Sequence, residues 1–344
     1  MNIHDVAKAA GVSISTVSRA FSAPERLSPK TLEAVMKAAR EADFVPNRAA
    51  RGLVTGLTGN IGVVVPDITN PFFPPIIKGV TDYAGAARQS VFLATTEESA
   101  NREQHLIDHL LQQVDGLIVC SSLLDDEALR RAAAKKPVVL VNRTSEPVSS
   151  VVIDTAGGMR QALGHLRSLG HTSFAFVSGP AGSWSNAERG AALLDEATTL
   201  GMQMRTIGPF AAHYESGVQA GDELIFGSDT AAVVFDDQMA LGVLSRLRNR
   251  GVRVPEDLSV IGCDDVLPVG LAQPALTTVA AAGGAAGTAA VEILLERIRS
   301  AEELAPVSVV QHSRLVIRDS TGPRPVAGRR DPLDDDHATA RPSL

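Results

Sequence analysis

The 344-residue sequence predicts a small all-α head followed by an α/β body made of two Rossmann-like lobes. Short amphipathic helical patterns occupy about the first 45 residues. From residue 61 onward, apolar and often β-branched runs alternate with helix-like stretches, which is typical of parallel sheets covered by helices on both faces. A chain of this length is also too long for one small core. We therefore expect a head over residues 1–45, a linking segment over 46–60, a body over 61–321 and a disordered tail over 322–344.

The first two helical patterns of the head lie on either side of Gly11. Gly11 can adopt the left-handed conformation that ends a helix, and Ser13 can cap the helix that follows. Apolar residues recur at helical spacing on both sides of this turn, namely Val6, Ala7 and Ala10 before it, and Val17, Ala20 and Phe21 after it. The pattern is typical of a helix-turn-helix unit, whose second helix lies in the DNA major groove. An ordinary helical hairpin is the alternative.

The second of these helices carries a short polar surface opposite its apolar stripe. One arginine and several hydroxyls on this surface can hydrogen-bond to bases and phosphates. The residues that we expect to contact DNA are Ile14, Ser15, Thr16, Ser18 and Arg19.

A third helix should begin at Ser28-Pro29, because a hydroxyl cap followed by proline is a strong helix start, and it should end near Glu41. The first 60 residues carry eight Lys and Arg against five Asp and Glu, a net charge of +3 that leaves −10 on the remaining chain. A basic head on an acidic body fits a module that contacts DNA, although the excess is small.

Two further segments extend this pattern. Residues 46–53 read Pro-Asn-Arg-Ala-Ala-Arg-Gly-Leu, and residues 67–73 read Asp-Ile-Thr-Asn-Pro-Phe-Phe. Together with the head, they resemble the lactose-repressor (LacI/GalR) family of bacterial transcription regulators, and the likeness extends over about residues 2–320. The resemblance implies a homodimer that binds a palindromic operator.

The resemblance also implies that the segment after the third helix folds into a hinge helix when the dimer meets its operator. Asn47 would cap this helix, Arg48 and Ala50 would face the minor groove, and Leu53 would insert as a wedge. An inserted apolar side chain unstacks a base step and kinks the duplex, which allows more protein surface to contact the DNA. A plain interdomain linker is the alternative.

The body should contain nine apolar strands separated by helices. We expect the strands at Ile61–Val65, Val91–Ala94, Gly116–Cys120, Val138–Val141, Val151–Ile153, Phe174–Val177, Ala232–Phe235, Leu258–Gly262 and Val307–Val310. Helix-like stretches include residues 76–88, 102–113, 157–169, 188–200, 239–251 and 287–298. The two lobes should be arranged as in periplasmic sugar-binding proteins, with the chain crossing between them near 155–162, 278–286 and 310–318.

A small molecule should bind between the lobes, because ligands of open parallel sheets bind at the carboxyl ends of the strands. Phe72 and Phe73 follow the first strand of the body, and Asn142 follows the Val138–Val141 strand. The phenylalanines can instead belong to the core, and we expect one of them to do so.

A polar loop from Gly179 to Arg189 matches the pocket loop of the family, which implies that its closing Arg189 grips the effector. Ser183, Trp184 and Ser185 lie in the same loop. Trp184 is the only tryptophan of the chain, and its ring can stack on a sugar or a base. It can equally pack on the surface or in an interface.

Asp236 and Asp264 each end an apolar strand and fall on effector positions of the family. A carboxylate that accepts from hydroxyls and an arginine that donates to them suit a polyol ligand. Helix capping is the alternative for both aspartates, since each is expected to precede a helical stretch.

The sequence gives little support to other classes of function, such as enzymes and metal-binding proteins. The sequence contains no GxxxxGK phosphate loop, no GxGxxG after a strand and no GxSxG, so we expect neither a cofactor nor catalysis. His105 and His109 have the spacing of two zinc ligands on a helix but no third ligand nearby, so we expect a solvated helix face and no metal. Cys120 and Cys263 should be buried thiols rather than a disulfide.

The sequence shows neither an apolar run long enough to span a membrane nor a secretory signal, so we expect a cytoplasmic protein with no membrane partner. A periplasmic transport protein would need such a signal and would have no use for the head. We expect a repressor whose operator affinity is controlled by a sugar or sugar derivative bound between the lobes.

Overall fold

A computed structural model describes residues 2–22, 24–44, 56–268, 270–300 and 302–325. The chain divides into two compact units, a head over residues 1–59 and a body over residues 60–344.

The head contains three α-helices and a short 3₁₀ helix, η1. Their bounds are α1 Ile3–Ala10, α2 Ile14–Ser22, η1 Pro24–Arg26 and α3 Pro29–Glu41. Asn2 caps α1 by accepting from the backbone N–H groups of His4 and Asp5. The predicted turn and caps are confirmed, because Gly11 is left-handed with φ 65°, Ser13 Oγ accepts from Thr16 N–H at 3.2 Å, and Ser28 caps α3.

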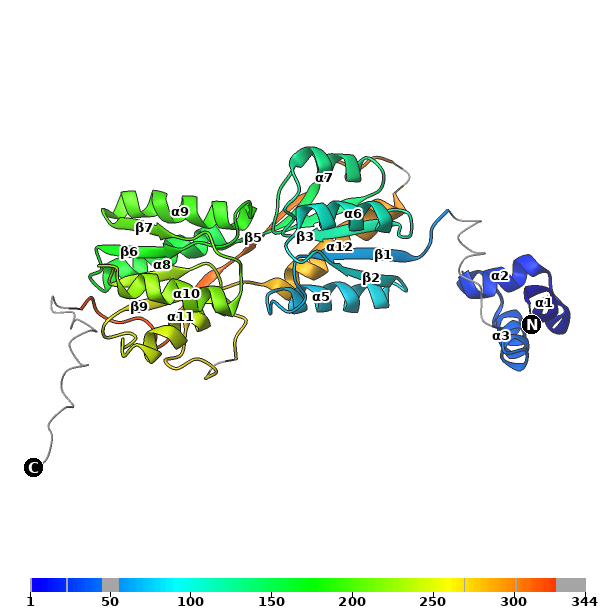
Figure 1. Cartoon of the computed structure of the whole chain (residues 1–344). Helices are drawn as coiled ribbons and strands as arrows, with labels where there is room; N and C mark the ends of the chain where they lie inside the picture. Colours follow the sequence, from blue (N-terminus) through cyan, green and yellow to red (C-terminus); the bar gives the residue numbers. More distant parts are fainter. Residues whose placement is uncertain (1, 23, 45–55, 269, 301, 326–344) are drawn as a thin grey trace, which may run out of the picture. The chain divides into compact units, whose positions relative to one another are not determined.

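The first lobe of the body is built on a six-stranded parallel sheet in the order β11-β5-β4-β3-β1-β2. Its strands are β1 Asn60–Val65, β2 Ser90–Thr95, β3 Gly116–Cys120, β4 Val138–Val141, β5 Ser149–Asp154 and β11 Ser308–His312. One face packs on α5 Phe73–Ala86 and α12 Gly283–Arg299, and the other on α6 Ala100–Leu110 and α7 Asp126–Ala133 (Figure 1).

The second lobe has the same layered design, with the strand order β12-β10-β9-β8-β6-β7. Its strands are β6 Ser173–Val177, β7 Gln203–Ile207, β8 Ala231–Val234, β9 Ser259–Asp264, β10 Thr277–Ala280 and the antiparallel β12 Arg314–Val316. Helices α8 Thr155–Ser168 and α9 Trp184–Leu200 cover one face, and α10 Tyr214–Ile225 and α11 Asp237–Asn249 cover the other. The predicted class of two Rossmann-like lobes is confirmed.

The chain crosses between the lobes three times. The crossings lie between β5 and α8 at residues 154–155, between β10 and α12 at residues 281–282, and at Ser313 between β11 and β12. They fall within or directly beside the three predicted segments. Because each lobe is completed by strands from two or more chain segments, a movement of one lobe must bend these crossings.

The structure adds elements that the apolar patterns did not predict, among them β7, β10, β12, α7 and α10. β7 is an edge strand of mixed polar and apolar residues with a half-exposed pattern, so no continuous apolar run marks it. The ordered chain also extends past Gly322, where we expected the disordered tail to begin. Gly322 N–H donates to Ser259 Oγ and Arg324 N–H to the Leu169 carbonyl, while residues 326–344 lie outside the described part.

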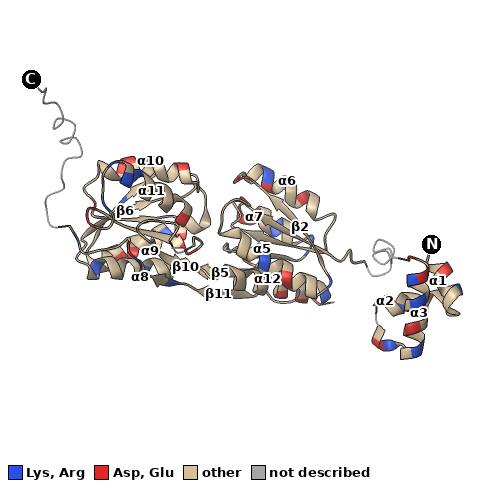
Figure 2. Ribbon diagram, turned by 90° about the horizontal axis from the view of Figure 1, so that it is seen from below, with Lys and Arg blue, Asp and Glu red and all other residues tan. Residues whose placement is uncertain are grey.

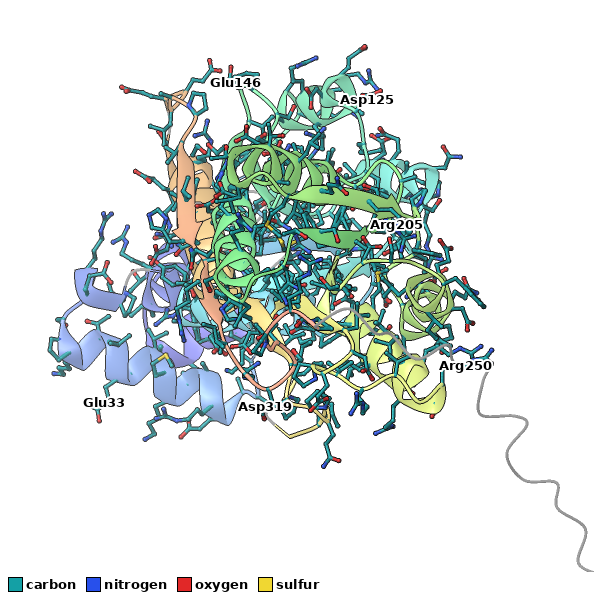
Figure 3. The ribbon with its side chains drawn as sticks, turned by 90° about the vertical axis from the view of Figure 1, so that its left-hand side faces the viewer. Glu33, Asp125, Glu146, Arg205, Arg250 and Asp319 are labelled. Atoms are coloured by element: carbon teal, nitrogen blue, oxygen red, sulfur yellow. The ribbon has the colours of Figure 1, made fainter. Side chains whose placement is uncertain are left out.

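Lys and Arg positions and Asp and Glu positions are both distributed over the helices of the body (Figure 2). Asp125, Glu146 and Arg250, for example, lie at the periphery of the molecule (Figure 3). Exposed ion pairs on these helices, such as Lys78–Asp82 and Arg131–Glu127, contribute about 0–1 kcal/mol each to stability. No described helix combines the length and the apolar character that a membrane crossing requires.

Glycines allow two pairs of helices to cross at very short range. A Cβ atom on Gly242 of α11 would lie 2.1 Å from the Tyr214 carbonyl oxygen of α10, and one on Gly217 would lie 2.0 Å from the Met239 carbonyl oxygen. Gly287 of α12 meets the Ile76 carbonyl oxygen of α5 in the same way, at 2.2 Å. Even a methyl group would therefore force the backbones of these helix pairs apart.

We predict that Gly242→Ala destabilises the body by about 1–3 kcal/mol or more, because the added methyl group meets rigid backbone rather than a movable side chain. The matched control is Gly164→Ala on the exposed face of α8, where nothing lies within 4 Å of the new Cβ. This variant should gain stability, by at most about 1 kcal/mol, from helix propensity. Thermal unfolding of both proteins checks the difference, and equal melting temperatures would contradict the tight crossing.

Candidate effector site between the lobes

A cavity lies between the two lobes and is lined by eight residues from each of them. Most of these residues follow the carboxyl ends of parallel strands, which is where the sequence predicted a ligand site. The empty space is about 540 Å³ including its open side. Polar and apolar side chains of both lobes line this cavity.

The lining includes eight of the nine residues that the sequence predicted for effector binding: Phe72, Phe73, Asn142, Ser183, Ser185, Arg189, Asp236 and Asp264. Trp184 is the exception. It is the first residue of α9, whose N-cap is Ser183, and it is half-buried outside the cavity lining. This position fits the alternative that Trp184 packs on the surface or in an interface.

We expected one of the two phenylalanines after β1 to belong to the core, and this expectation was too narrow. Phe72 and Phe73 are both 5% exposed and belong to the same core cluster, with their rings 5.1 Å apart in an edge-to-face arrangement. Both also border the cavity. The core of the first lobe thus forms one wall of the site.

Arg189 is the central cation of the site and is only 2% exposed. Its Nη2 donates to Asp264 Oδ1 at 3.0 Å, its Nε donates to Thr155 Oγ1 at 3.3 Å, and its Nη1 donates to the Phe235 carbonyl. The guanidinium also lies over the Phe235 ring, 4.7 Å from its centroid. Among the described ion pairs, Arg189–Asp264 is the one in which both side chains are buried.

The two aspartates differ in the way they are held. Asp236 caps α11 by accepting from Met239 N–H at 2.8 Å, so the capping alternative is right for this residue. Asp236 also borders the cavity. For Asp264 that alternative is wrong, because no helix begins among the described residues between β9 and β10. Asp264 instead has φ 108° and turns its carboxylate to Arg189.

Three carboxyl groups share the single buried cation. Burial and, to a smaller extent, the charge of Asp264 raise the pKa of Asp236 to about 6. Burial also raises the pKa of Asp264, although Arg189 opposes this shift. Behind them, Asp237 accepts from Thr278 Oγ1 at 2.6 Å and Val266 N–H at 3.1 Å, and burial raises its pKa well above the ordinary value. The floor of the cavity therefore carries excess negative charge when it is ionised.

Two side-chain hydrogen bonds join the lobes across the cavity. Asn142 Nδ2 donates to Ser185 Oγ at 2.8 Å, and Asn70 Nδ2 donates to Asp236 Oδ2 at 3.4 Å. The other amide atom of Asn142, Oδ1, is buried without a hydrogen-bond partner among the described residues. A buried acceptor without a donor costs about 1–3 kcal/mol, so this atom marks a place where a ligand donor would be favourable.

Several strand ends around the cavity have left-handed backbone conformations. Ser121, Asn142 and Asp264 have φ values of 46°, 57° and 108°, and Glu98 after β2 has φ 54°. Such conformations cost about 1–3 kcal/mol each for residues other than glycine, and they concentrate at ligand sites. Here they turn polar side chains toward the space between the lobes.

Asn70, Glu98 and Ser121 also line the cavity, and Asp237 supports its floor, but the sequence did not single them out for this role. Asn70 lay within the motif at residues 67–73, and Ser121 follows β3 just as Asn142 follows β4. These two positions in the sequence could have indicated that Asn70 and Ser121 line the cavity. Glu98 offered none, because its approach to the cavity depends on the turn at residues 97–98.

In the head, α2 presents the surface that the sequence predicted for DNA. Ile14, Ser15, Ser18 and Arg19 are exposed and Thr16 is half-exposed, whereas Val17 and Ala20 are buried. The predicted hinge residues Asn47, Arg48, Ala50 and Leu53 lie outside the described residues.

Two histidines and two cysteines of the body were the remaining candidates. His105 and His109 are exposed neighbours on α6, with ring centroids 4.4 Å apart, and no cluster of three metal-ligating side chains occurs in the described part of the chain. Cys120 and Cys263 are buried free thiols, which confirms the prediction.

Comparison with known proteins gives matches over both units. Residues 2–47 match the family "Bacterial regulatory proteins, lacI family", and residues 163–321 match "Periplasmic binding protein-like domain". Catabolite control protein A of Priestia megaterium is 31% identical over 93% of this chain and 99% of its own length.

Two solved structures extend the likeness to the fold of nearly the whole chain. The lac repressor dimer bound to operator and the anti-inducer ONPF has a TM-score of 0.82 at 28% identity, over 94% of this chain and 99% of its own. The complex of the transcriptional regulator CelR with cellobiose has a TM-score of 0.68 at 32% identity, over 93% of this chain and 99% of the CelR chain.

We predict that Asp236→Asn stabilises the ligand-free protein at pH 7.5 and that this gain shrinks toward pH 5. The folded protein holds the proton of Asp236 up to a pKa of about 6, whereas the unfolded chain releases it near 4. The folded state thus binds more protons in this window, and its stability falls as the pH rises, by at most about 3 kcal/mol for this group. Asparagine removes the charge but keeps an acceptor for Met239.

Thermal unfolding at the two pH values checks this prediction. Asp125→Asn is the matched control, because Asp125 caps α7 through Ala128 N–H in the same way but is exposed. A gain from Asp236→Asn that is the same at pH 5 and pH 7.5 would show that its charge is not the cause.

Proposed function

The chain belongs to the LacI family of bacterial regulatory proteins and is a ligand-controlled, DNA-binding transcription regulator, and we propose that it acts as a repressor whose effector binds in the interlobe cavity. A homodimer would place its two α2 helices in successive major grooves of a palindromic operator. We also propose that it acts in the cytoplasm, where the chromosome lies, and that it binds its effector without converting it.

The proposed DNA surface follows from the packing of the head. Val17 and Ala20 anchor α2 in the head core, so that Ser15, Ser18 and Arg19 face outward on a stiff support. Arginine can make a paired hydrogen bond to guanine, and serine hydroxyls can bond to bases or phosphates. The hinge role of Asn47, Arg48, Ala50 and Leu53 is part of the same proposal and rests on the family resemblance.

The observation that carries the effector proposal is that the two lobes contribute equally to one cavity and bond to each other across it. A ligand that replaces these bonds changes the free energy of the closed arrangement relative to the open one. Carboxylate, amide and hydroxyl groups suit the hydroxyls of a carbohydrate. One solved structure is a complex of the transcriptional regulator CelR with cellobiose, and we propose a sugar or sugar derivative for this chain.

The crossings between the lobes offer a route from the cavity to the head. Arg189 bonds to Thr155 at the first crossing, and the Asp264 carbonyl accepts from Ala281 N–H at the second. Ser313 at the third donates to the Asp154 carbonyl. A ligand that shifts Arg189 and Asp264 would therefore bias the angle between the lobes and, in a dimer, the spacing of the hinges.

We predict that Arg19→Ala lowers the affinity for the operator by about 10- to 100-fold and relaxes the preference at one base pair. Lys37→Ala, which removes the same charge from α3, should weaken all DNA binding by a smaller and uniform factor. Fluorescence anisotropy with an operator selected from a random DNA pool, and with an unrelated duplex, measures both effects. If Arg19→Ala lost affinity equally for the two duplexes, Arg19 would not read sequence.

The proposed control by a small molecule is tested with the full chain and a panel of sugars. A ligand that binds raises the melting temperature, since it stabilises the folded state by about 2.7 kcal/mol at a hundredfold excess over its Kd. Each ligand found in this way should then change the operator Kd, about 5-fold or more for a typical coupling free energy. If every ligand that binds left operator affinity unchanged, the body would not control the head.

A further inference from the structure

The charges around the cavity are unevenly balanced. Its lining contains three carboxylates, those of Glu98, Asp236 and Asp264, and a single permanently charged cation, Arg189. Asp237 lies directly behind this lining. Burial raises the pKa of Glu98. His213 of the second lobe lies near Glu98, and its electrostatic attraction for the carboxylate opposes part of this rise. An anionic ligand would therefore enter a site that already holds excess negative charge.

Arg189 is poorly placed to correct this imbalance. All three of its nitrogens donate to protein acceptors, and one of these acceptors is the Asp264 carboxylate. The hydrogens that remain on Nη1 and Nη2 can still donate to a ligand hydroxyl. Its charge, however, is already neutralised by Asp264, so that a phosphate or carboxylate would have to compete with a buried ion pair.

Helix N-termini commonly bind anions, but those of α5, α9 and α11 at the cavity lack N–H groups or are already capped, whereas that of α10 has no side-chain cap. The first turn of α5 contains Pro74 and Pro75, which have no N–H, and Phe72 N–H donates to Asn70 Oδ1. The side chain of Ser183 caps α9, and that of Asp236 caps α11. A fourth helix, α10, begins beside the cavity with an acidic residue in its first turn. These helix ends therefore offer little to a phosphate group.

Among the residues that line the cavity, the buried group without a hydrogen-bond partner in the described part of the chain is an acceptor. Asn142 is 2% exposed and lines the cavity, its Nδ2 is used by Ser185, and its buried Oδ1 has no donor among the described residues. A ligand hydroxyl or ammonium group can donate to this oxygen, whereas a phosphate dianion cannot.

From these observations we infer that the cavity selects a polyol without an anionic group, either a neutral sugar or an amino sugar, and rejects phosphorylated and carboxylated sugars. This inference rests on the proposed function, because it specifies the effector of the same site. The selection is electrostatic: acceptors of the protein meet donors of the ligand, and like charges repel the anionic analogues.

The test uses matched sets of ligands with the full-length chain. Each neutral sugar, such as glucose, galactose, mannose or ribose, is compared with its amino, phosphate and uronic or aldonic acid counterparts by thermal shift and calorimetry at pH 7.5. Every sugar that binds should bind about tenfold or more tightly than its anionic counterpart. The inference is overturned if an anionic sugar binds more tightly than its neutral parent, or if neither neutral nor amino sugars bind.

A pair of variants tests the role of charge directly. Glu98→Gln should reduce the discrimination against the anionic counterpart by about 3-fold or more, because one lining carboxylate is lost. Glu97→Gln is the matched control, since Glu97 has nearly the same φ (53° against 54°) but is exposed and pairs with Arg102 at 2.6 Å. Equal discrimination in both variants would refute the electrostatic explanation.

Failure of this inference can be told apart from failure of the proposed function. If an anionic sugar binds tightly and changes operator affinity, the regulator is correct and the ligand class is wrong. If a neutral sugar binds as expected but leaves operator affinity unchanged, the ligand class is correct and the regulatory proposal is wrong.

Discussion

The buried pair of Arg189 and Asp264 is the interaction on which the site depends. A charge that is removed from water needs a partner, and removing one member of a buried pair costs about 3–5 kcal/mol. Here the pair joins the start of α9 to the end of β9, and the same guanidinium reaches the start of α8 and the carbonyl that follows β8. One cation thus fixes the strand ends of the second lobe and places a rigid polar floor beneath the cavity.

The contacts between the lobes are of a different kind. Asn142–Ser185 and Asn70–Asp236 are single hydrogen bonds made by amide groups of the first lobe. Such bonds contribute only about 0.5–1.5 kcal/mol each when both partners can otherwise bond to water. A ligand with several hydroxyls can therefore replace them at little net cost. A fixed floor in one lobe and weak, replaceable contacts from the other are the properties that a ligand-operated switch requires.

The sequence predicted the head helices and both lobes because their signals are local: caps, apolar periodicity and continuous apolar strands. It failed for α10, whose Gly217 and Gly221 lower helix propensity and are explained only by the close approach of α11. The residues of the site were likewise predicted only in part. Arg189 and Asp264 were predicted through the family resemblance, whereas Glu98 and Ser121 reach the cavity through left-handed turns that residue type does not reveal.

We propose that the effector and the operator bind to coupled states of one protein, which makes their effects reciprocal. The most direct measurement is the calorimetric Kd of the effector with and without saturating operator duplex. Operator should change effector affinity by the same factor by which effector changes operator affinity. An effector Kd that is identical in both conditions, for a ligand that binds in the cavity, would contradict it.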